Sequence, residues 1–195
     1  MKPSTHGSLG FARPEILFLF ACLLIVLSLG VPVFLEWRDY QYSQKAYQEL
    51  RIMLSAADQF HREYRLWPAS ARDARHDIRF GLQRENGDVI RTLAAMEGEG
   101  NEDNLTNPQR LNCFELTGVS DVFVELTLDP RGNAIDPWGN PYQMVFDVNY
   151  DSICSIPESS YAAVVGEGVV MWSMGPDRRT GTRDDLRSWV IENAR

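Results

Sequence analysis

Residues 16–34 form an uninterrupted apolar segment near the start of the chain, and none of these nineteen residues is charged. At about 1.5 Å of rise per residue, a helix of this length spans roughly 28 Å, close to the hydrocarbon thickness of a bilayer. The pattern therefore predicts one membrane-spanning helix over residues 11–34, with membrane lipid around it. Lys2 and Arg13 precede the apolar segment and acidic residues follow it, so we expect a cytoplasmic N-terminus and an exported remainder.

The pattern then changes to that of an amphipathic helix over residues 36–67, which contain neither Gly nor Pro. Because an α-helix repeats every 3.6 residues, apolar side chains at steps of three, four and seven share one face. These are Trp37, Tyr40, Tyr47, Leu50, Leu54, Ala57, Phe60 and Tyr64. We expect one continuous helix of over fifty residues that bends, if anywhere, at Gly30 and Pro32 and ends at Trp67-Pro68.

The remaining chain predicts a small α+β domain. Residues 88–96 favour a short second helix, and residues 97–107 (EGEGNEDNLTN) favour a solvated loop. Short alternating segments between turn residues then predict an antiparallel sheet packed on the long helix, with strands at 122–128, 142–147, 162–165, 169–172 and 187–191. No internal repeat is identified.

Composition narrows the classes of function. The chain has 195 residues and a formal net charge of -8, which disfavours a nucleic-acid surface because such surfaces need clustered Lys and Arg. Its three histidines are scattered, and no zinc, nucleophile-elbow or phosphate-loop motif occurs. We therefore expect a protein that is not an enzyme, with one folded domain after the membrane segment.

Two of the three cysteines, Cys113 and Cys154, fall in the part predicted to be exported. A cysteine pair in an oxidising compartment predicts a disulfide. Two free buried thiols are the alternative, because the sequence does not show whether the pair comes within bridging distance.

Glu15 directly precedes the charge-free run. A carboxylate at the edge of a membrane helix is costly unless a positive charge accompanies it. If the chain were cut after Gly10, Phe11 would carry a new amino group that can neutralise Glu15 of a neighbouring subunit. The membrane segment would then also be an assembly element.

The order of Gly10, Phe11 and Glu15 before an apolar helix with Pro32 resembles the N-terminus of type IV pilins and type II secretion pseudopilins. In that family a prepilin peptidase cuts after the glycine and methylates the new N-terminal phenylalanine. The resemblance implies a leader peptide at residues 1–10. Residues 12–14 (Ala-Arg-Pro) depart from the usual pattern, and an uncleaved signal anchor is the alternative.

Residues 136–142 (DPWGNPY) are dense in turn formers and predict a tight hairpin entry. This heptapeptide also resembles, residue for residue, the strand-turn motif of the major, G-type, pseudopilin of type II secretion systems. The resemblance implies a type IV pilin-like fold. A long helix with a transmembrane half at 11–34 and an exported half at 35–68 would pack on a globular domain at 69–195.

Near the C-terminus, residues 173–186 (SMGPDRRTGTRDDL) offer carboxylate, hydroxyl and carbonyl oxygens, which suit a hard cation such as calcium. The segment resembles the calcium-binding loop of the same pseudopilins. That resemblance implies Asp177 and Asp185 as side-chain ligands, with Asp184 and Thr182 as helpers. A loop in which its own arginines pair with the aspartates is the alternative.

A third acidic segment, residues 147–151 (DVNYD), has the first three ligand spacings of an EF-hand, with Glu158 at the twelfth position. Ser152 stands where an EF-hand needs Gly, and strands rather than helices flank the segment. We interpret it as a turn.

Together these resemblances imply a structural subunit of a type II secretion pseudopilus, held in the inner membrane with its domain in the periplasm. Its expected partners are other copies of itself, minor pseudopilins, the inner-membrane secretion platform and the prepilin peptidase, and its expected cofactor is calcium. One alternative is a pilin-like subunit of a type IV pilus or DNA-uptake system. An alternative from another class is a signal-anchored exported calcium-binding domain or enzyme.

Overall fold

The computed structural model describes residues 13–69, 76–116, 126–156 and 164–189. The chain divides into two compact units, Met1–Gln41 and Tyr42–Arg195. The described part of the first unit is helix alone, and the second unit contains the strands and the shorter helices.

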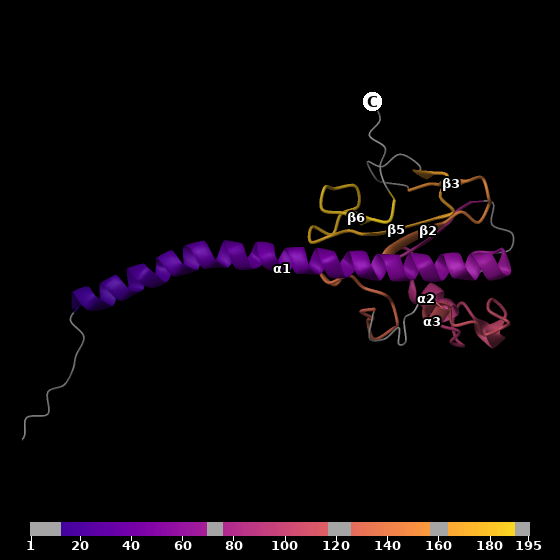
Figure 1. Cartoon of the computed structure of the whole chain (residues 1–195), viewed down its shortest axis with the longest axis horizontal. Helices are drawn as coiled ribbons and strands as arrows, with labels where there is room; N and C mark the ends of the chain where they lie inside the picture. Colours follow the sequence, from indigo (N-terminus) through magenta and orange to yellow (C-terminus); the bar gives the residue numbers. More distant parts are fainter. Residues whose placement is uncertain (1–12, 70–75, 117–125, 157–163, 190–195) are drawn as a thin grey trace, which may run out of the picture. The chain divides into compact units, whose positions relative to one another are not determined.

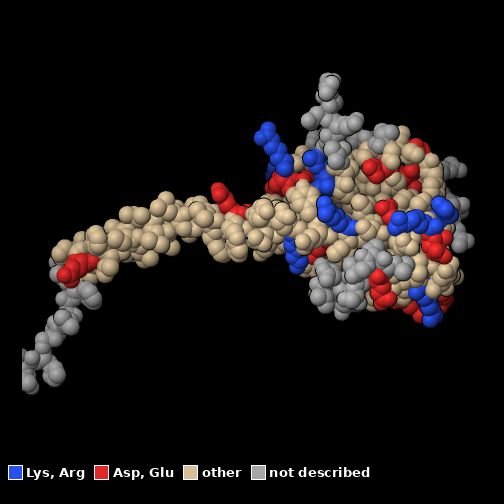
Figure 2. Space-filling model, in the orientation of Figure 1, with Lys and Arg blue, Asp and Glu red and all other residues tan. Residues whose placement is uncertain are grey.

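Helix α1 spans Arg13–Tyr64 and contains 52 residues, so the prediction of one long helix is confirmed. Pro32 lies inside the helix without ending it. Within the described residues, this is the one helix long and apolar enough to cross a membrane. Figure 2 shows the apolar part of α1 as a tan stretch, with charged residues only near the two ends of that stretch. The helix therefore fits a single-pass membrane anchor by length and composition.

Helix α1 ends at Tyr64. The sequence predicted that it would end three residues later, at Trp67-Pro68. Arg65 adopts a left-handed conformation with φ of 56°, and its N–H donates to the carbonyl of His61 at 2.8 Å. A left-handed residue directly after the last helical turn is a common way for helices to stop. The proline at 68 is therefore not what ends this helix.

A four-stranded antiparallel sheet with the order β1-β2-β5-β6 forms the centre of the second unit. Its strands are β1 (Ile78–Phe80), β2 (Gln143–Phe146), β5 (Val169–Ser173) and β6 (Leu186–Arg187). Strands β3 (Ile153–Cys154) and β4 (Val164–Val165) form a separate antiparallel pair. In Figure 1 the sheet lies on one side of residues 42–64 of α1, and the shorter helices lie on the other.

Three of the five predicted strands correspond to strands of the structure, namely β2, β4 and β5. The predicted strand at 187–191 shares only Arg187 with β6, and its last two residues lie outside the described residues. The fifth, at 122–128, lies mostly outside the described residues, and its end makes only an isolated bridge between Leu128 and Ala134. Strands β1 and β3 were not predicted. Each is only three or two residues long, too short for a recognisable alternation.

The predicted short helix is present as α2 (Gly87–Leu93), and it is followed by the 3₁₀-helix η1 (Glu102–Asn104) and α3 (Cys113–Leu116). The prediction of a solvated loop at 97–107 is partly wrong, because Asn101 and Asn107 are fully buried. The amide of Asn107 donates to the carbonyls of Thr92 and Leu111, at 2.8 and 2.9 Å. Asparagines that satisfy backbone groups hold this loop in place.

Two apolar clusters lie on opposite faces of the sheet. Along β2, Met144 and Phe146 belong to the larger cluster, whereas Val145 belongs to the smaller one. This alternation follows from the two-residue period of a strand. The larger cluster joins the sheet to buried residues of α1, including Ala46, Leu50, Met53, Ala57 and Phe60, and to Val89, Ile90 and Leu93 of α2.

Glu49 is a carboxylate of α1 within this core and is only 1% exposed. One oxygen accepts bonds from the N–H and hydroxyl of Thr127, at 3.0 and 2.9 Å, and the other accepts from the hydroxyl of Tyr142 at 2.5 Å. Burial, together with the nearby charge of Glu49, raises the pKa of Tyr142, which keeps its hydroxyl a donor. The helix is thereby bonded to the end of the DPWGNPY segment.

The predicted disulfide between Cys113 and Cys154 is not formed, and both residues are free buried thiols. Cys113 belongs to the larger cluster and Cys154 to the smaller one, on the other side of the sheet. Burial raises the pKa of each thiol to about 12, so both stay protonated. The structure therefore agrees with the alternative that the sequence left open, in which Cys113 and Cys154 are two free buried thiols.

Candidate functional site

The acidic C-terminal loop connects β5 to β6, which are neighbouring antiparallel strands. The pairing of Ser173 with Leu186 closes this loop at its base. Asp177, Asp184 and Asp185 each place one carboxylate oxygen within 4.8 Å of the others. The structure thus brings together the three aspartates that the sequence proposed as a cation site.

The carboxylates of the loop are arranged by hydrogen bonds from the loop itself. The hydroxyl of Thr182 donates to Asp184 at 2.7 Å and lies 3.2 Å from a carboxylate oxygen of Asp185. The N–H of Gly181 donates to Asp185 at 2.7 Å, and that of Asp177 donates to Asp184 at 3.2 Å. Thr182 therefore lies beside two of the aspartates, as expected for the helper residue.

Two arginines of the loop, Arg178 and Arg179, could pair with the aspartates according to the alternative that the sequence left open. Both side chains are exposed, and within the described part of the chain no ion pair joins either of them to the three aspartates. Asp185 is only 5% exposed. Three close carboxylates and a hydroxyl are a donor set that suits calcium. The residues present therefore fit the ion.

DPWGNPY forms the tight turn that the sequence predicted, and the structure shows that a turn of the same kind precedes it. Residues 129–133 (DPRGN) and 136–140 (DPWGN) share four of five residues. In each turn, the aspartate carboxylate accepts the backbone N–H and the side-chain amide of the asparagine four residues later. In each, the glycine has a positive φ, 84° and 87°. We call them the first and second DPxGN turns.

This repeated turn was not predicted from the sequence. The pattern Asp-Pro-any-Gly-Asn, recurring after seven residues, is visible there and could have found it. Proline, glycine and asparagine are the residues that such turns require.

A second acidic cluster joins Asp77, Asp147 and Asp151, with carboxylate oxygens within 4.8 Å of one another. Asp147 accepts the N–H groups of Asp151 and Ser152, as expected for the predicted turn. Glu158 lies outside the described residues. Asp77 was not predicted here, because only the fold brings the start of β1 beside this turn. Burial raises the pKa of Asp77, and the charges of the other two aspartates raise it further.

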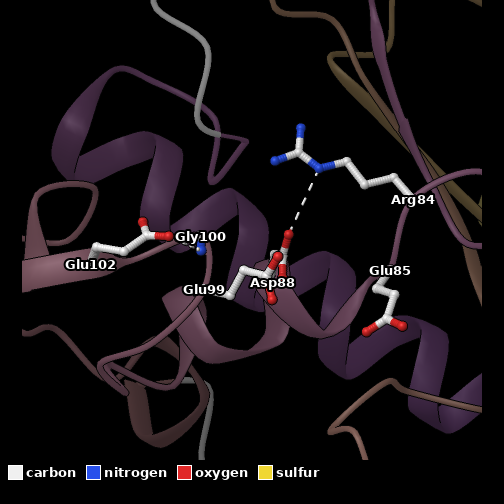
Figure 3. Close-up of a pocket in the computed structure, with 6 residues that line it drawn as sticks. All are labelled: Arg84, Glu85, Asp88, Glu99, Gly100 and Glu102. Atoms are coloured by element: carbon white, nitrogen blue, oxygen red, sulfur yellow. Dashed lines mark hydrogen bonds and ion pairs between the residues drawn. The ribbon is translucent and has the colours of Figure 1, made fainter.

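A polar cleft of about 490 Å³ lies beside α2, and Figure 3 shows the six residues that line it. Two of its four carboxylates, those of Glu85 and Asp88, are in ion pairs within the chain. Asp88 lies 3.7 Å from Arg84 and 2.7 Å from Arg91, and Glu85 lies 2.8 Å from Arg131. The carboxylate of Glu102 accepts the N–H of Gly100 at 3.3 Å. These ion pairs favour a structural role for the cleft over a binding role.

The predicted cleavage site, Gly10 and Phe11, lies outside the described residues. Glu15 occupies the first turn of α1 and is exposed. At the other end of the apolar run, Phe34, Trp37 and Tyr40 are each 59% exposed. Exposed aromatic side chains at the end of an apolar helix are typical of a membrane–water interface.

The chain matches no protein-family model, no curated protein and no solved structure in the comparisons. Any function assigned to the chain therefore rests on its sequence and on the geometry of its described residues.

Proposed function

We propose that this chain is a membrane-anchored structural subunit of a pilin-like filament, of the type II secretion pseudopilus class. One observation carries the proposal. A single helix, Arg13–Tyr64, begins with an exposed apolar stretch and ends with residues that form the core of an α+β unit. The same helix thus contains the membrane segment and contributes to the core of the folded unit.

In this proposal the apolar stretch has two successive environments. In the membrane it contacts lipid, and in a filament it contacts the same stretch of neighbouring copies. Both environments exclude water from side chains such as Leu17, Leu24 and Val33, so transfer from one to the other keeps them buried. The work of the subunit is then assembly, and no catalytic step is involved. Minor subunits, an inner-membrane platform and a prepilin peptidase are its proposed partners.

Glu15 is proposed to set the register of this packing. After cleavage behind Gly10, the amino group of Phe11 in one copy would neutralise the carboxylate of Glu15 in the next. A carboxylate without such a positive charge is unfavourable at the edge of an apolar region, so a misaligned subunit would be disfavoured.

Calcium is proposed to bind the acidic loop through Asp177, Asp184 and Asp185, with Thr182 beside them. Bound there, the ion would supply positive charge to three close carboxylates and so stabilise the connection between β5 and β6. The loop would then favour one conformation for contacts between neighbouring subunits.

Replacing Glu15 by Gln tests the assembly proposal. We expect the level of protein in the membrane to be unchanged and the yield of sheared filaments to fall about tenfold or more, because each 1.4 kcal/mol of lost subunit contact is a factor of ten. Glu36→Gln, on the other side of the span, is the matched control and should assemble normally. Filaments from Glu15→Gln at the wild-type yield would overturn the role of Glu15.

The alternative of another class is an exported domain that is anchored and does not assemble. It predicts that no filament forms from the unaltered chain, whichever variant is compared.

A further inference from the structure

The two DPxGN turns make the same internal bonds but contact different neighbours. In the first, the side-chain oxygen of Asn133 accepts the N–H of Gly87, the first residue of α2, at 2.9 Å. In the second, the side-chain amide of Asn140 donates to the carbonyl of Gly175 at 2.8 Å. Asparagines at equivalent turn positions thus hold a helix start in one case and the acidic loop in the other.

A second connection runs between the second turn and the same point of the loop. The hydroxyl of Ser173 donates to the carboxylate of Asp136 at 2.5 Å, and it accepts the N–H of Gly175 at 3.1 Å. Asp136, Asn140 and Ser173 are at most 4% exposed. The carbonyl of Gly175 is therefore bonded by Asn140 and its N–H by Ser173, and both of these side chains are buried.

Gly175 in turn lies directly against Asp184. It has a φ of +62°, and a methyl group on its α-carbon would lie 2.7 Å from both the carbonyl oxygen and a carboxylate oxygen of Asp184. Gly175 therefore packs closely against Asp184, with no space for a side chain between them. A shift of Gly175 would change the packing around one carboxylate of the cluster.

We propose that Asn140 is a positioning residue for the acidic loop: with Asp136 and Ser173 it holds Gly175, and Gly175 places Asp184 among the three aspartates. Its effect on cation binding rests on the proposed function of that loop. Its effect on the loop itself does not, because these contacts join protein groups alone.

Amide hydrogen exchange of the full-length protein in detergent, free of divalent cations, tests this chain of contacts. The reporters are the N–H groups of Asp177 and Gly181, which donate to Asp184 and Asp185. In Asn140→Ala we expect both to exchange at least about fivefold faster, as for the loss of one buried hydrogen bond. The matched control is Asn133→Ala, which removes the equivalent turn bond and should leave both reporters within about twofold of the unaltered chain.

Ser173→Ala is a second variant, useful if Asn140→Ala does not fold. It removes the other connection to Gly175 and should also speed exchange at both reporters. Unchanged exchange in both variants, or equal acceleration in Asn133→Ala, would overturn the positioning role. The latter result would mean that the turns act only through global stability.

Terbium, which occupies calcium sites, gives the second measurement. The indole N–H of Trp172 donates to Thr180 in the loop at 3.3 Å, so this ring is placed to sensitise terbium bound there. We expect terbium affinity about fivefold weaker in Asn140→Ala and unchanged in Asn133→Ala. Equal affinities in all three proteins would count against Asn140 as a positioning residue. Absence of binding by the unaltered chain would remove the proposed cation site, while the exchange comparison would still decide the role of Asn140.

Discussion

At the scale of single residues, buried charge is the feature that the fold controls most closely. Glu49 is buried, but it accepts hydrogen bonds from Thr127 and Tyr142 and lies 3.8 Å from the ammonium of Lys45. Asp77 differs, because one of its carboxylate oxygens is buried and accepts no hydrogen bond from the described residues. Its neighbours Asp147 and Asp151 are also acidic. A partly buried carboxylate beside two others is unfavourable in its charged form.

Because the charged form of Asp77 is unfavourable in the folded protein, we predict that Asp77→Asn stabilises the protein at neutral pH. The folded-state pKa of Asp77 is raised, so folding is penalised above that pKa, where the group must be charged, and the penalty disappears as the pH falls below the ordinary carboxyl value of about 4. We expect a higher Tm than the unaltered protein at pH 7 in chelator, and no difference at pH 3. Thermal unfolding at both values measures this, and a lower Tm at pH 7 would contradict it.

The sequence predicted one of the two acidic clusters and could not predict the other. The three aspartates of the C-terminal loop were found because they lie within nine residues of one another. Asp77 is seventy residues from Asp147 in the chain and meets it only through the pairing of β1 with β2. The disulfide prediction was wrong for a related reason, since the faces of the sheet to which Cys113 and Cys154 belong are set by tertiary packing.

At the scale of elements, helices and strands with a long periodic pattern could be predicted from the sequence, and very short strands could not. The 52-residue helix α1 and strands β2 and β5 follow from sustained apolar spacing. Strands β1 and β3 depend on their pairing partners, because two or three residues carry too little periodicity. The end of α1 depends on Arg65, a residue type that rarely adopts a positive φ, so no residue preference indicated it.

The end of the apolar stretch of α1 gives a prediction about membrane depth. The ring of Trp37, exposed and three residues past the charge-free run, should lie at the membrane–water interface. In vesicles, lipids brominated near the headgroup should quench tryptophan fluorescence more than lipids brominated near the bilayer centre. Trp37→Phe should remove this quenching, and Trp138→Phe should retain it.

Failure of the chain to float with vesicles would contradict the anchor itself. Flotation with the strongest quenching at the bilayer centre would contradict only the position of Trp37.

At the scale of the whole molecule, the proposed cation site predicts a coupling between calcium and stability. A ligand at about one hundred times its Kd stabilises the folded state by about 2.7 kcal/mol, which corresponds to a rise in Tm of roughly 5 to 10 °C for a chain of this size. We expect such a rise on adding calcium and its reversal by chelator. Asp177→Asn should reduce the rise to less than half.

The matched control for this prediction is Asp151→Asn, which alters the other acidic cluster and should retain the full rise. A rise that survives Asp177→Asn but is lost in Asp151→Asn would place calcium at the Asp77 cluster instead. No rise in the unaltered chain would mean that calcium is not a ligand of this protein.

The central claim is that α1 belongs to a subunit that is processed and then assembled. N-terminal mass spectrometry of the protein, purified from its native membrane, tests this claim most directly. We predict a mature chain that begins with N-methylated Phe11. A chain that still begins at Met1, or that is cut at another position, would contradict the claim and leave α1 as a plain membrane anchor.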